Sequence, residues 1–268
     1  VVQFIDVGIA EEHAVTMAAG VAKNGGKPIV VSLSTFYQRT YDQIAQDMCI
    51  NKCAATLLVR NGSIWGDTDE THLGFFDIAM MSNIPNLVYI APTNCEEYLA
   101  MLDWSIEQNE YPVTIRIPCN KLVHTDKHVD KDYSNLNKSL VVRKGEKVAL
   151  FALGDFSQMG EEFVKAIEEE FGFRPTLINP RYITGLDVDL LEMLKSNHQL
   201  VLTLEDGVIE GGYGKKITSY YGTSNMKVLN YGLKKEFTNG IKASELLIDN
   251  GIFIDNIIKN IGRLLVEK

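Results

Sequence analysis

Short apolar runs alternate with segments of helical period along most of this 268-residue chain. Such alternation is typical of α/β folds built around parallel sheets, in which each strand is followed by a helix. Strands are expected at residues 1–5, 28–32, 55–59, 87–90, 113–117, 147–153, 175–178, 198–204 and 227–231. Helices are expected near residues 14–22, 41–49, 96–106, 159–170, 188–195, 243–249 and 254–266.

The alternation stops between residues 118 and 146, where the sequence becomes polar. A stretch of this length without regular structure is unusual inside a compact domain. We therefore expect an α/β domain at residues 1–120, a polar linker at 121–146, and a second, smaller α/β domain at 147–268. His124 and His128 lie four residues apart in the linker, but no third ligand accompanies them, which favours a solvated segment over a metal site.

The chain begins with Val1-Val2-Gln3-Phe4-Ile5, an apolar sequence typical of a buried strand, with no methionine before it. Native proteins rarely begin inside a core strand. We therefore expect the chain to be part of a longer polypeptide or to have been trimmed.

Charge and composition limit the partners. The chain has 35 acidic against 26 basic residues, a net charge of −9, and such a surface repels nucleic acid and anionic membranes. No apolar run approaches the roughly 20 residues that span a bilayer. With no secretory signal and only four cysteines, we expect a cytoplasmic protein without a disulfide framework. Cys49 and Cys53 lie four residues apart in a helical segment, and the lack of a second ligand pair favours core positions for them.

A glycine cluster at residues 207–214 lies between a predicted strand and a predicted helix. Its spacing fits neither the dinucleotide-binding nor the P-loop pattern. A tight turn, in which strand and helix backbones approach closely, is the favoured interpretation, and we expect no nucleotide there.

Three polar segments, at residues 6–13, 34–43 and 60–72, each lie at the end of an apolar strand. Taken singly, each is compatible with helix capping or with an exposed loop. In open α/β sheets, however, ligands collect beyond the carboxyl ends of the strands. The three segments together therefore predict one binding site.

These segments resemble thiamine-diphosphate enzymes of the transketolase superfamily, specifically the 1-deoxy-D-xylulose-5-phosphate synthase family. Residues 6–15 read D-V-G-I-A-E-E-H-A-V, close to that family's D-V-G-I-A-E-Q-H-A-V. Residues 34–43 match its S-T-F-L-Q-R-A-Y-D-Q at eight of ten positions, and residues 71–78 match T-H-x-G-x-F-D-I. Weaker similarities lie at 84–92, 179–183 and 205–214. The resemblance implies a pyrimidine-binding domain at 1–120 and a transketolase C-terminal domain at 147–268.

The resemblance also implies which residues hold the cofactor, thiamine diphosphate. Glu11 aligns with the glutamate that shares a proton with N1′ of the aminopyrimidine ring, while Glu12 stands where the family usually has glutamine. Phe36 aligns with the aromatic residue that stacks on that ring, since a flat apolar face suits a flat heterocycle. Arg39 belongs to the same pocket.

Substrate groups follow from the same alignment. His72 would move protons to and from substrate oxygens, a role that suits an imidazole. Arg60 would bind the phosphate of the acceptor through its bidentate fork. Asp67 or Asp69 would bind the hydroxyl groups of the acceptor; the loop is one residue longer than the family pattern, so both remain candidates.

Two departures from the family fall in the acceptor pocket. Cys119 stands where the family has a second phosphate-binding arginine, and Leu33 stands where a substrate-facing tyrosine is typical. Losing one charge-assisted phosphate contact costs about 1.5–3 kcal/mol. These departures lead to the hypothesis that the thiamine chemistry is retained while the acceptor differs from glyceraldehyde 3-phosphate.

A third departure concerns the metal. The family motif G-D-G followed by a distant asparagine, which holds Mg²⁺ and the cofactor diphosphate, is absent from the sequence. Mg²⁺ needs hard oxygen ligands, and we expect no metal site in this chain. The diphosphate-binding half is then expected on a missing N-terminal segment or a separate subunit, and the isolated chain is expected to be inactive.

By resemblance, the complete enzyme would decarboxylate pyruvate and join the two-carbon unit to an aldose-phosphate aldehyde. Its product, 1-deoxyxylulose 5-phosphate, would feed isoprenoid and thiamine synthesis, and the enzyme would be a homodimer. Two alternatives stay open: the C-terminal subunit of a split transketolase, and a non-catalytic module of the same fold. The presence of Glu11, Phe36, Arg39 and His72 argues against the non-catalytic module.

Overall fold

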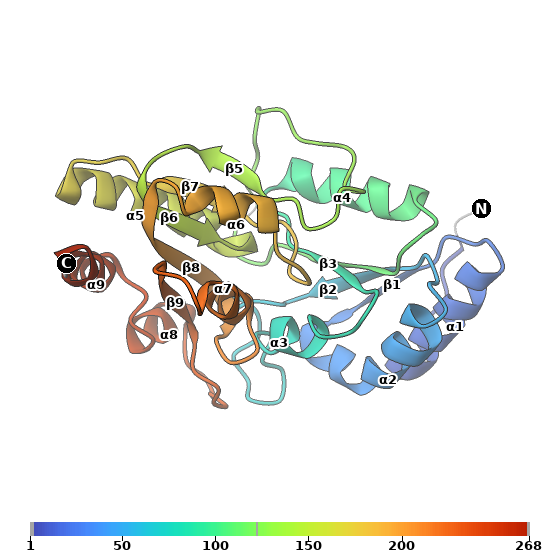
Figure 1. Ribbon diagram of the computed structural model, residues 1–268. Helices are drawn as coiled ribbons and strands as arrows, with labels where there is room; N and C mark the ends of the chain where they lie inside the picture. The colour runs from blue at the N-terminus through green and yellow to red at the C-terminus, as the bar shows by residue number, and fades with distance from the viewer. Residues whose placement is uncertain (1–2, 122, 267–268) are drawn as a thin grey trace.

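Two β-sheets organise the chain in the computed structural model, which describes residues 3–121 and 123–266 (Figure 1). The first half of the chain forms a four-stranded sheet and the second half a five-stranded sheet. Helices cover the faces of both sheets. The predicted fold class, two α/β domains, is confirmed.

The first sheet is parallel throughout, in the order β1-β2-β4-β3. Its strands are β1 (Ile29–Leu33), β2 (Thr56–Arg60), β3 (Val88–Ile90) and β4 (Val113–Arg116). Helix α1 (Glu11–Lys23) packs on one face through Val15, and α4 (Cys95–Glu107) packs on the other through Met101 and Trp104. Because both faces are covered, β2 and β4 are almost continuously buried rather than alternating.

Between β1 and β2 the chain makes consecutive helical turns of different pitch. These are the 3₁₀ segment η1 (Ser34–Thr40), α2 (Tyr41–Gln43) and the π segment η2 (Ile44–Cys49). Tyr37 anchors η1, because its buried hydroxyl lies 3.1 Å from the carbonyl of Val30 and 3.2 Å from that of Leu58. The helix predicted for 41–49 is therefore present, but it is mostly wound as a π-helix, a form often found at functional sites.

The second sheet has the order β5-β7-β6-β8-β9, with β5 antiparallel and the other strands parallel. Its strands are β5 (Leu140–Arg143), β6 (Lys147–Ala152), β7 (Thr176–Asn179), β8 (His198–Val208) and β9 (Lys227–Leu233). The helices of this half are α5 (Ser157–Phe171), α6 (Val188–Leu194), α7 (Tyr213–Tyr221), α8 (Ala243–Asp249) and α9 (Ile254–Val266). The two sides of the sheet have separate cores: α5 and α9 share one with Leu150, and α6 and α7 share the other with Phe151.

The strand predicted for residues 1–5 is wrong for residues 3–5, the part that the structure describes. Residues 3–5 form no strand, and Phe4 and Ile5 are 82% and 63% exposed, because no neighbouring strand pairs with them. Val1 and Val2 lie outside the described residues.

The segment expected to be a linker contains a strand. The run Leu140–Arg143 pairs with β7 and alternates between exposed and half-buried residues, so its apolar signal is weak in the sequence. The domain boundaries at 120 and 147 stay predictions. The short helix α3 (Asp77–Met81) was likewise not predicted from the sequence.

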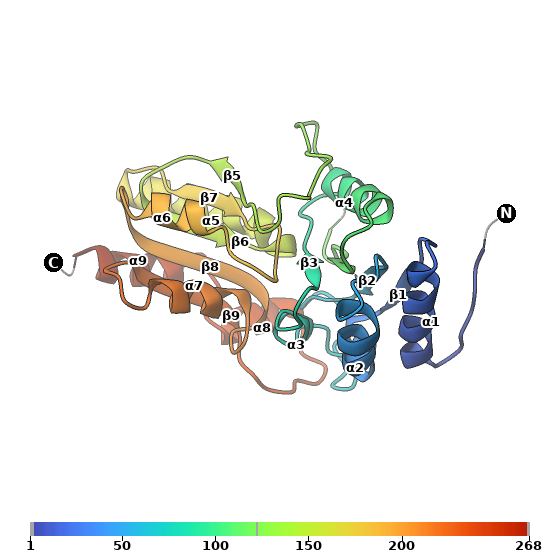
Figure 2. The same cartoon turned by 45° about the vertical axis from the view of Figure 1, so that its right-hand side comes forward.

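Backbone as well as side chains join the two halves, and α3 lies beside β8 at their contact (Figure 2). Ile90, at the end of β3, forms an antiparallel bridge with Tyr182. The ammonium group of Lys216 on α7 donates to the carbonyls of Ser82 (3.4 Å), Ile183 (2.6 Å) and Thr184 (3.2 Å). Burial lowers the pKa of Lys216 to about 8.

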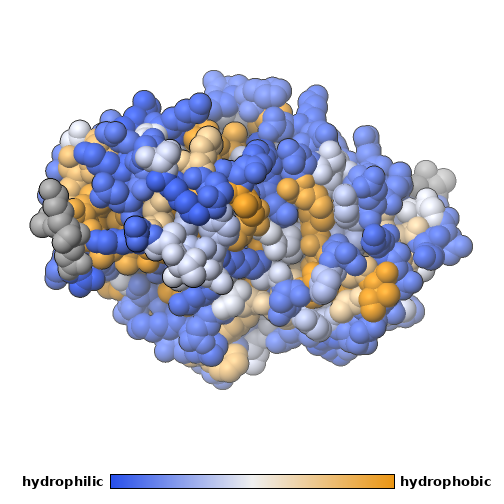
Figure 3. All heavy atoms as spheres, viewed as in Figure 1, coloured by the Kyte–Doolittle hydropathy of each residue, from blue (hydrophilic) through white to orange (hydrophobic). Residues whose placement is uncertain are grey.

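Polar residues cover most of the face seen in Figure 3, and apolar residues are confined to separate patches. Across residues 3–121 and 123–266, none of the helices combines the length and apolarity needed to cross a bilayer. The same residues contain no group of three His, Cys, Asp or Glu side chains placed to hold a metal ion.

Candidate active site

Glu11 and Arg39 form an ion pair at the start of α1. Acidic residues are favoured in the first turn of a helix, because they offset the partial positive charge there. Arg39 Nη1 lies 3.2 Å from Glu11 Oε2, and Nη2 lies 3.2 Å from Glu12 Oε1. The Glu11 side chain is 14% exposed and that of Arg39 is 47% exposed, so Glu11 is the more buried member of the pair.

Phe36 and His72 meet at the other end of η1. The centroids of their rings lie 5.4 Å apart in an edge-to-face arrangement. Hydroxyl groups hold η1 against the 71–74 loop: Ser34 Oγ donates to the carbonyl of Gly74 (2.7 Å), and Thr35 Oγ1 donates to that of Thr71 (3.3 Å). Because η1 carries both Phe36 and Arg39, it links the aromatic contact to the Glu11 ion pair.

The imidazole of His72 is oriented from one side. Its Nδ1 lies 2.8 Å from Thr71 Oγ1 and 3.6 Å from an Asp69 oxygen. Hydrogen bonds donated by the Thr71 hydroxyl and N–H lower the pKa of Asp69, so this carboxylate stays ionised beside the ring. The contacts on Nδ1 leave Nε2 as the nitrogen that can face a substrate.

Asp67 and Asp69 have different neighbours, although both are exposed. Asp67 Oδ2 accepts a hydrogen bond from Asn61 Nδ2 (2.9 Å), and Asn61 Oδ1 lies 4.0 Å from the thiol of Cys119. Asp69 lies with His72 instead. The exposed Arg60 ends β2 opposite Leu33 in strand register, and its guanidinium has no hydrogen bond or ion pair within the described residues. Asn61 thus connects Asp67 with Cys119, whereas the Arg60 guanidinium contacts neither of them.

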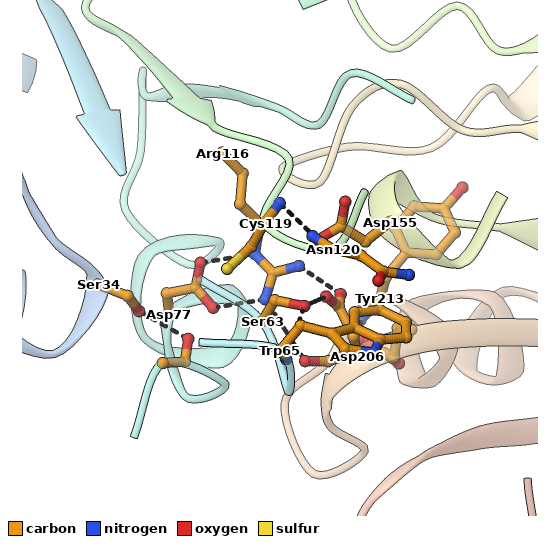
Figure 4. Close-up of polar contacts among 12 residues, drawn as sticks. Ser34, Ser63, Trp65, Asp77, Arg116, Cys119, Asn120, Asp155, Asp206 and Tyr213 are labelled. Atoms are coloured by element: carbon orange, nitrogen blue, oxygen red, sulfur yellow. Dashed lines mark hydrogen bonds and ion pairs between the residues drawn. The ribbon is translucent and has the colours of Figure 1, made fainter. Parts of the chain in front are cut away.

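A buried charge network, which was not predicted from the sequence, lies between the two domains (Figure 4). Arg116 Nε donates to Asp77 Oδ2 at 2.8 Å, and its Nη1 donates to Asp206 of the second sheet. Ser63 Oγ donates to the other Asp206 oxygen at 2.5 Å, and the hydroxyl of Tyr89 donates to Asp77. Arg116, Asp77 and Asp206 are all buried.

One signal in the sequence pointed to this network. Arg116 ends a run of buried residues in β4, and Asp206 lies inside the apolar strand β8. Charged groups in such positions must be paired, because an isolated buried charge is very costly. Their pairing with each other depends on how the two sheets pack, which no local pattern shows.

The glycine-rich turn at 207–214 is confirmed as a close approach of strand and helix. The carboxylate of Glu205 accepts the N–H groups of Tyr213 (2.7 Å) and Gly214 (2.8 Å) at the start of α7. A Cβ atom at Gly212 would lie 2.4 Å from Glu205 Oε2. Burial raises the pKa of Glu205 to about 7.

The cysteine and histidine pairs also have ordinary environments. Cys49 and Cys53 are buried in the first domain core, as predicted. His124 contacts Glu96 at 2.8 Å on the surface, and His128 is exposed.

Residues 2–123 match the model of the transketolase pyrimidine-binding domain, and residues 137–252 match that of the transketolase C-terminal domain. Among curated proteins, the chain is 39% identical over 233 residues to 1-deoxy-D-xylulose-5-phosphate synthase of Clostridium botulinum, covering 85% of this chain and 37% of the relative. It is 34% identical over 264 residues to the synthase of Lachnoclostridium phytofermentans, covering 97% of this chain and 42% of the relative. The chain thus spans about two fifths of the length of these relatives.

A solved structure described as a split gene transketolase, an inactive β4 tetramer, has the same fold. Its TM-score is 0.83 at 21% identity, and the match covers 98% of this chain and 84% of that one. It therefore supports the two-domain architecture alone. Each half of the chain matches one transketolase domain model, so the chain belongs to the transketolase family.

Proposed function

We propose that this chain supplies the pyrimidine-binding and C-terminal domains of a thiamine-diphosphate-dependent transferase of the 1-deoxy-D-xylulose-5-phosphate synthase type. The reaction would join a two-carbon unit from pyruvate to an aldehyde, glyceraldehyde 3-phosphate being the acceptor that the resemblance implies. The relatives named above support this reaction class. We further propose that a separate or missing half holds Mg²⁺ and the cofactor diphosphate, and that the assembled enzyme is a cytoplasmic homodimer.

The observation that carries the proposal is the arrangement along η1. Glu11 and Arg39 lie at one end, and Phe36 and His72 meet at the other. The cofactor presents a flat heterocycle with a basic ring nitrogen, which needs an aromatic face and a carboxyl group together. Glu11 uses Oε2 for Arg39, and within the described residues no contact engages Oε1. The residues present therefore fit the aminopyrimidine.

When bound, thiamine diphosphate would supply a nucleophilic carbon for reaction with the carbonyl of the donor. Glu11 would hold a proton at the ring nitrogen, and Arg39 would fix the orientation of its carboxylate. Phe36 would bind the ring face and exclude water from it. His72, held at Nδ1 by Thr71 and Asp69, would exchange a proton at Nε2 with a substrate oxygen.

The test is reconstitution of the chain with the diphosphate-binding half, followed by measurement of pyruvate-dependent CO₂ release. Glu11→Gln should lower kcat by about 10²- to 10⁴-fold, because it removes the proton-sharing carboxyl. Glu12→Gln is the matched control, since it changes the adjacent acid to the residue usual in the family, and it should leave the rate within about twofold. An unchanged rate in Glu11→Gln would favour a non-catalytic module.

A donor comparison separates the remaining alternative. Cleavage of a ketose phosphate without pyruvate consumption, by the same reconstituted protein, would indicate a split transketolase. Consumption of pyruvate with no cleavage of ketose phosphates would support the synthase reaction.

A further inference from the structure

The loop that follows β2, residues 61–76, carries Asp67, Asp69 and His72 but forms neither helix nor strand. Arg60, in contrast, is held at the end of β2 itself. In the proposed function one acceptor molecule contacts Arg60 and the loop together, so the loop must keep a set position relative to the sheet. A loop of this length has no regular hydrogen bonding of its own to keep it there, and such loops are often functional.

The second domain holds this loop at several points. Phe156, in the 3₁₀ segment η3 (Gly154–Phe156), packs edge to face on Trp65, with ring centroids 5.4 Å apart. The N–H of Val208, at the end of β8, donates to the carbonyl of Phe75 at 3.1 Å. These contacts lie near the two ends of the loop.

The middle of the loop is reached from the segment between β9 and α8, residues 234–242, which extends below β9 in Figure 1. We call this segment the β9–α8 loop. The N–H of Gly240 donates to the carbonyl of Thr68 at 2.8 Å. Thr68 is the residue between the two candidate aspartates, so this hydrogen bond holds the backbone from which both carboxylates extend.

Phe237, also in the β9–α8 loop, contacts the end of the 61–76 loop. The centroid of its ring lies 5.6 Å from that of Phe76, which lies 4.9 Å from that of Phe75. Phe237 is 79% exposed, so burial in a core does not account for its position. Its ring contact with Phe76 holds the point at which the 61–76 loop enters α3.

The β9–α8 loop is itself anchored in the second domain. The N–H of Lys234 donates to Asn250 Oδ1 at 2.8 Å. Thr238 is buried, and Ile241 packs against the core that α5 and α9 share. The loop can therefore transmit the position of the second domain to the residues that it contacts.

The candidate aspartates depend on the second domain more than on the first. Within the described residues, the hydrogen bonds and ring contacts that residues 65–70 make outside the 61–76 loop come from Phe156 and Gly240. The first domain contacts the loop further along, through the hydroxyl groups of η1 described above.

We propose that Phe237 and Gly240 are positioning residues for the aldehyde acceptor. They hold the 61–76 loop where its polar groups and Arg60 can bind one acceptor molecule. This inference rests on the proposed function, because it concerns the same site, and it gives the second domain a part in the acceptor step.

Amide hydrogen exchange of the chain, followed by NMR, tests the positioning without turnover. The N–H groups of Thr71 and His72 each donate to Asp69 at 2.9 Å, so their exchange rates report the order of the loop. Phe237→Ala should accelerate exchange at both amides at least about threefold, whereas Phe237→Tyr keeps the ring and should stay within about twofold of the unmodified chain. Phe253→Ala, which removes another exposed phenylalanine of the second domain, is the control and should change neither amide.

Two matched glycines test the hydrogen bond to Thr68. Gly240 has a φ of 69° and Gly172, at the end of α5, has a φ of 68°, and a Cβ atom at either would meet no atom within 4 Å. Alanine therefore strains the backbone similarly at both positions. Gly240→Ala should accelerate exchange of the Thr71 and His72 amides at least about threefold, whereas Gly172→Ala should not. Gly240→Asn should restore slow exchange, because asparagine tolerates a left-handed φ.

Unchanged exchange in Phe237→Ala would overturn the role of Phe237. Equal exchange rates in Gly240→Ala and Gly172→Ala would overturn that of Gly240.

The enzyme reconstituted with the diphosphate-binding half tests the consequence for the acceptor. Phe237→Ala should raise KM for glyceraldehyde 3-phosphate at least about fivefold and leave KM for pyruvate within about twofold, because Phe237 contacts none of the groups placed at the cofactor. Phe237→Tyr should restore the lower value. An equal rise in both KM values, or no rise for the aldehyde, would contradict a role in the acceptor step.

The same experiments distinguish failure of this inference from failure of the proposed function. If the reconstituted unmodified chain consumes no pyruvate with glyceraldehyde 3-phosphate or with glyceraldehyde, the proposed function is wrong, and the exchange rates still decide whether Phe237 and Gly240 hold the loop. If it consumes pyruvate and Phe237→Ala behaves like the unmodified chain, only this inference is wrong.

Discussion

Two arginine–carboxylate groups differ sharply in their surroundings. Arg39 pairs with Glu11 and Glu12 at a half-exposed rim, whereas Arg116 pairs with Asp77 and Asp206 in the buried contact between domains. An exposed pair contributes little to stability, so its members can change partners when a ligand arrives. A buried pair cannot separate without leaving an uncompensated charge. The two groups are named here by their exposure: the rim is Arg39 with Glu11 and Glu12, and the base is Arg116 with Asp77 and Asp206. The ion pairs of the rim can rearrange, whereas those of the base are fixed.

The largest expected effect comes from breaking the buried network. Arg116→Met should lower the free energy of unfolding by about 3–5 kcal/mol, because it leaves two buried carboxylates facing each other without a cation. Urea unfolding followed by circular dichroism measures this loss. A loss below about 1 kcal/mol would show that the three groups do not act as a buried unit.

A second effect is the pH dependence of the same region. Burial raises the folded-state pKa of Glu205 to about 7 and that of Asp206 to about 6, above their usual values of 4.5 and 3.8. At pH values between the usual and the raised pKa of each group, the folded chain binds more protons than the unfolded chain. The free energy of unfolding therefore falls as pH rises from about 4 to about 7.

The change attributable to Glu205 is on the order of 3 kcal/mol. Urea unfolding at a series of pH values measures it, and Glu205→Gln should flatten the profile, since the amide does not titrate. A stability that rises over this pH range in the unmodified chain would contradict the assignment.

The smallest effect is expected at the rim. Arg39→Met should change the free energy of unfolding by less than about 1 kcal/mol, because the guanidinium is 47% exposed and water replaces its contacts. The same urea unfolding experiment measures it beside Arg116→Met. A loss as large as that of Arg116→Met would remove the distinction between rim and base.

The parts that could be predicted from sequence are those with a local signal. Strands β2 and β8 could be predicted from their apolar runs, and α4 from its helical period. The 34–43 and 71–78 motifs indicated the segments that bring Phe36 and His72 together. The strand β5 could not be predicted, because its few apolar residues gain meaning only from pairing with β7. The strand predicted at the start of the chain was wrong in the opposite sense, since Phe4 and Ile5 are apolar but no strand pairs with residues 3–5.

The network around Arg116 shows a deeper limit. Arg116 and Asp206 lie 90 positions apart in sequence, and their contact depends on how the two sheets pack. A charged residue at the end of a buried strand indicates that some partner exists, but its identity is a property of the tertiary structure. The hydrogen bond from Gly240 to Thr68 is hidden for the same reason.

Lys216 has an evolutionary consequence. Its three acceptors, the carbonyls of residues 82, 183 and 184, belong to the backbone and are present whatever side chains stand there. The three hydrogen bonds of Lys216 therefore require no particular side chain at positions 82, 183 and 184. Covariation between amino-acid types would not reveal this contact, since its three acceptors are backbone carbonyls, which every amino acid supplies.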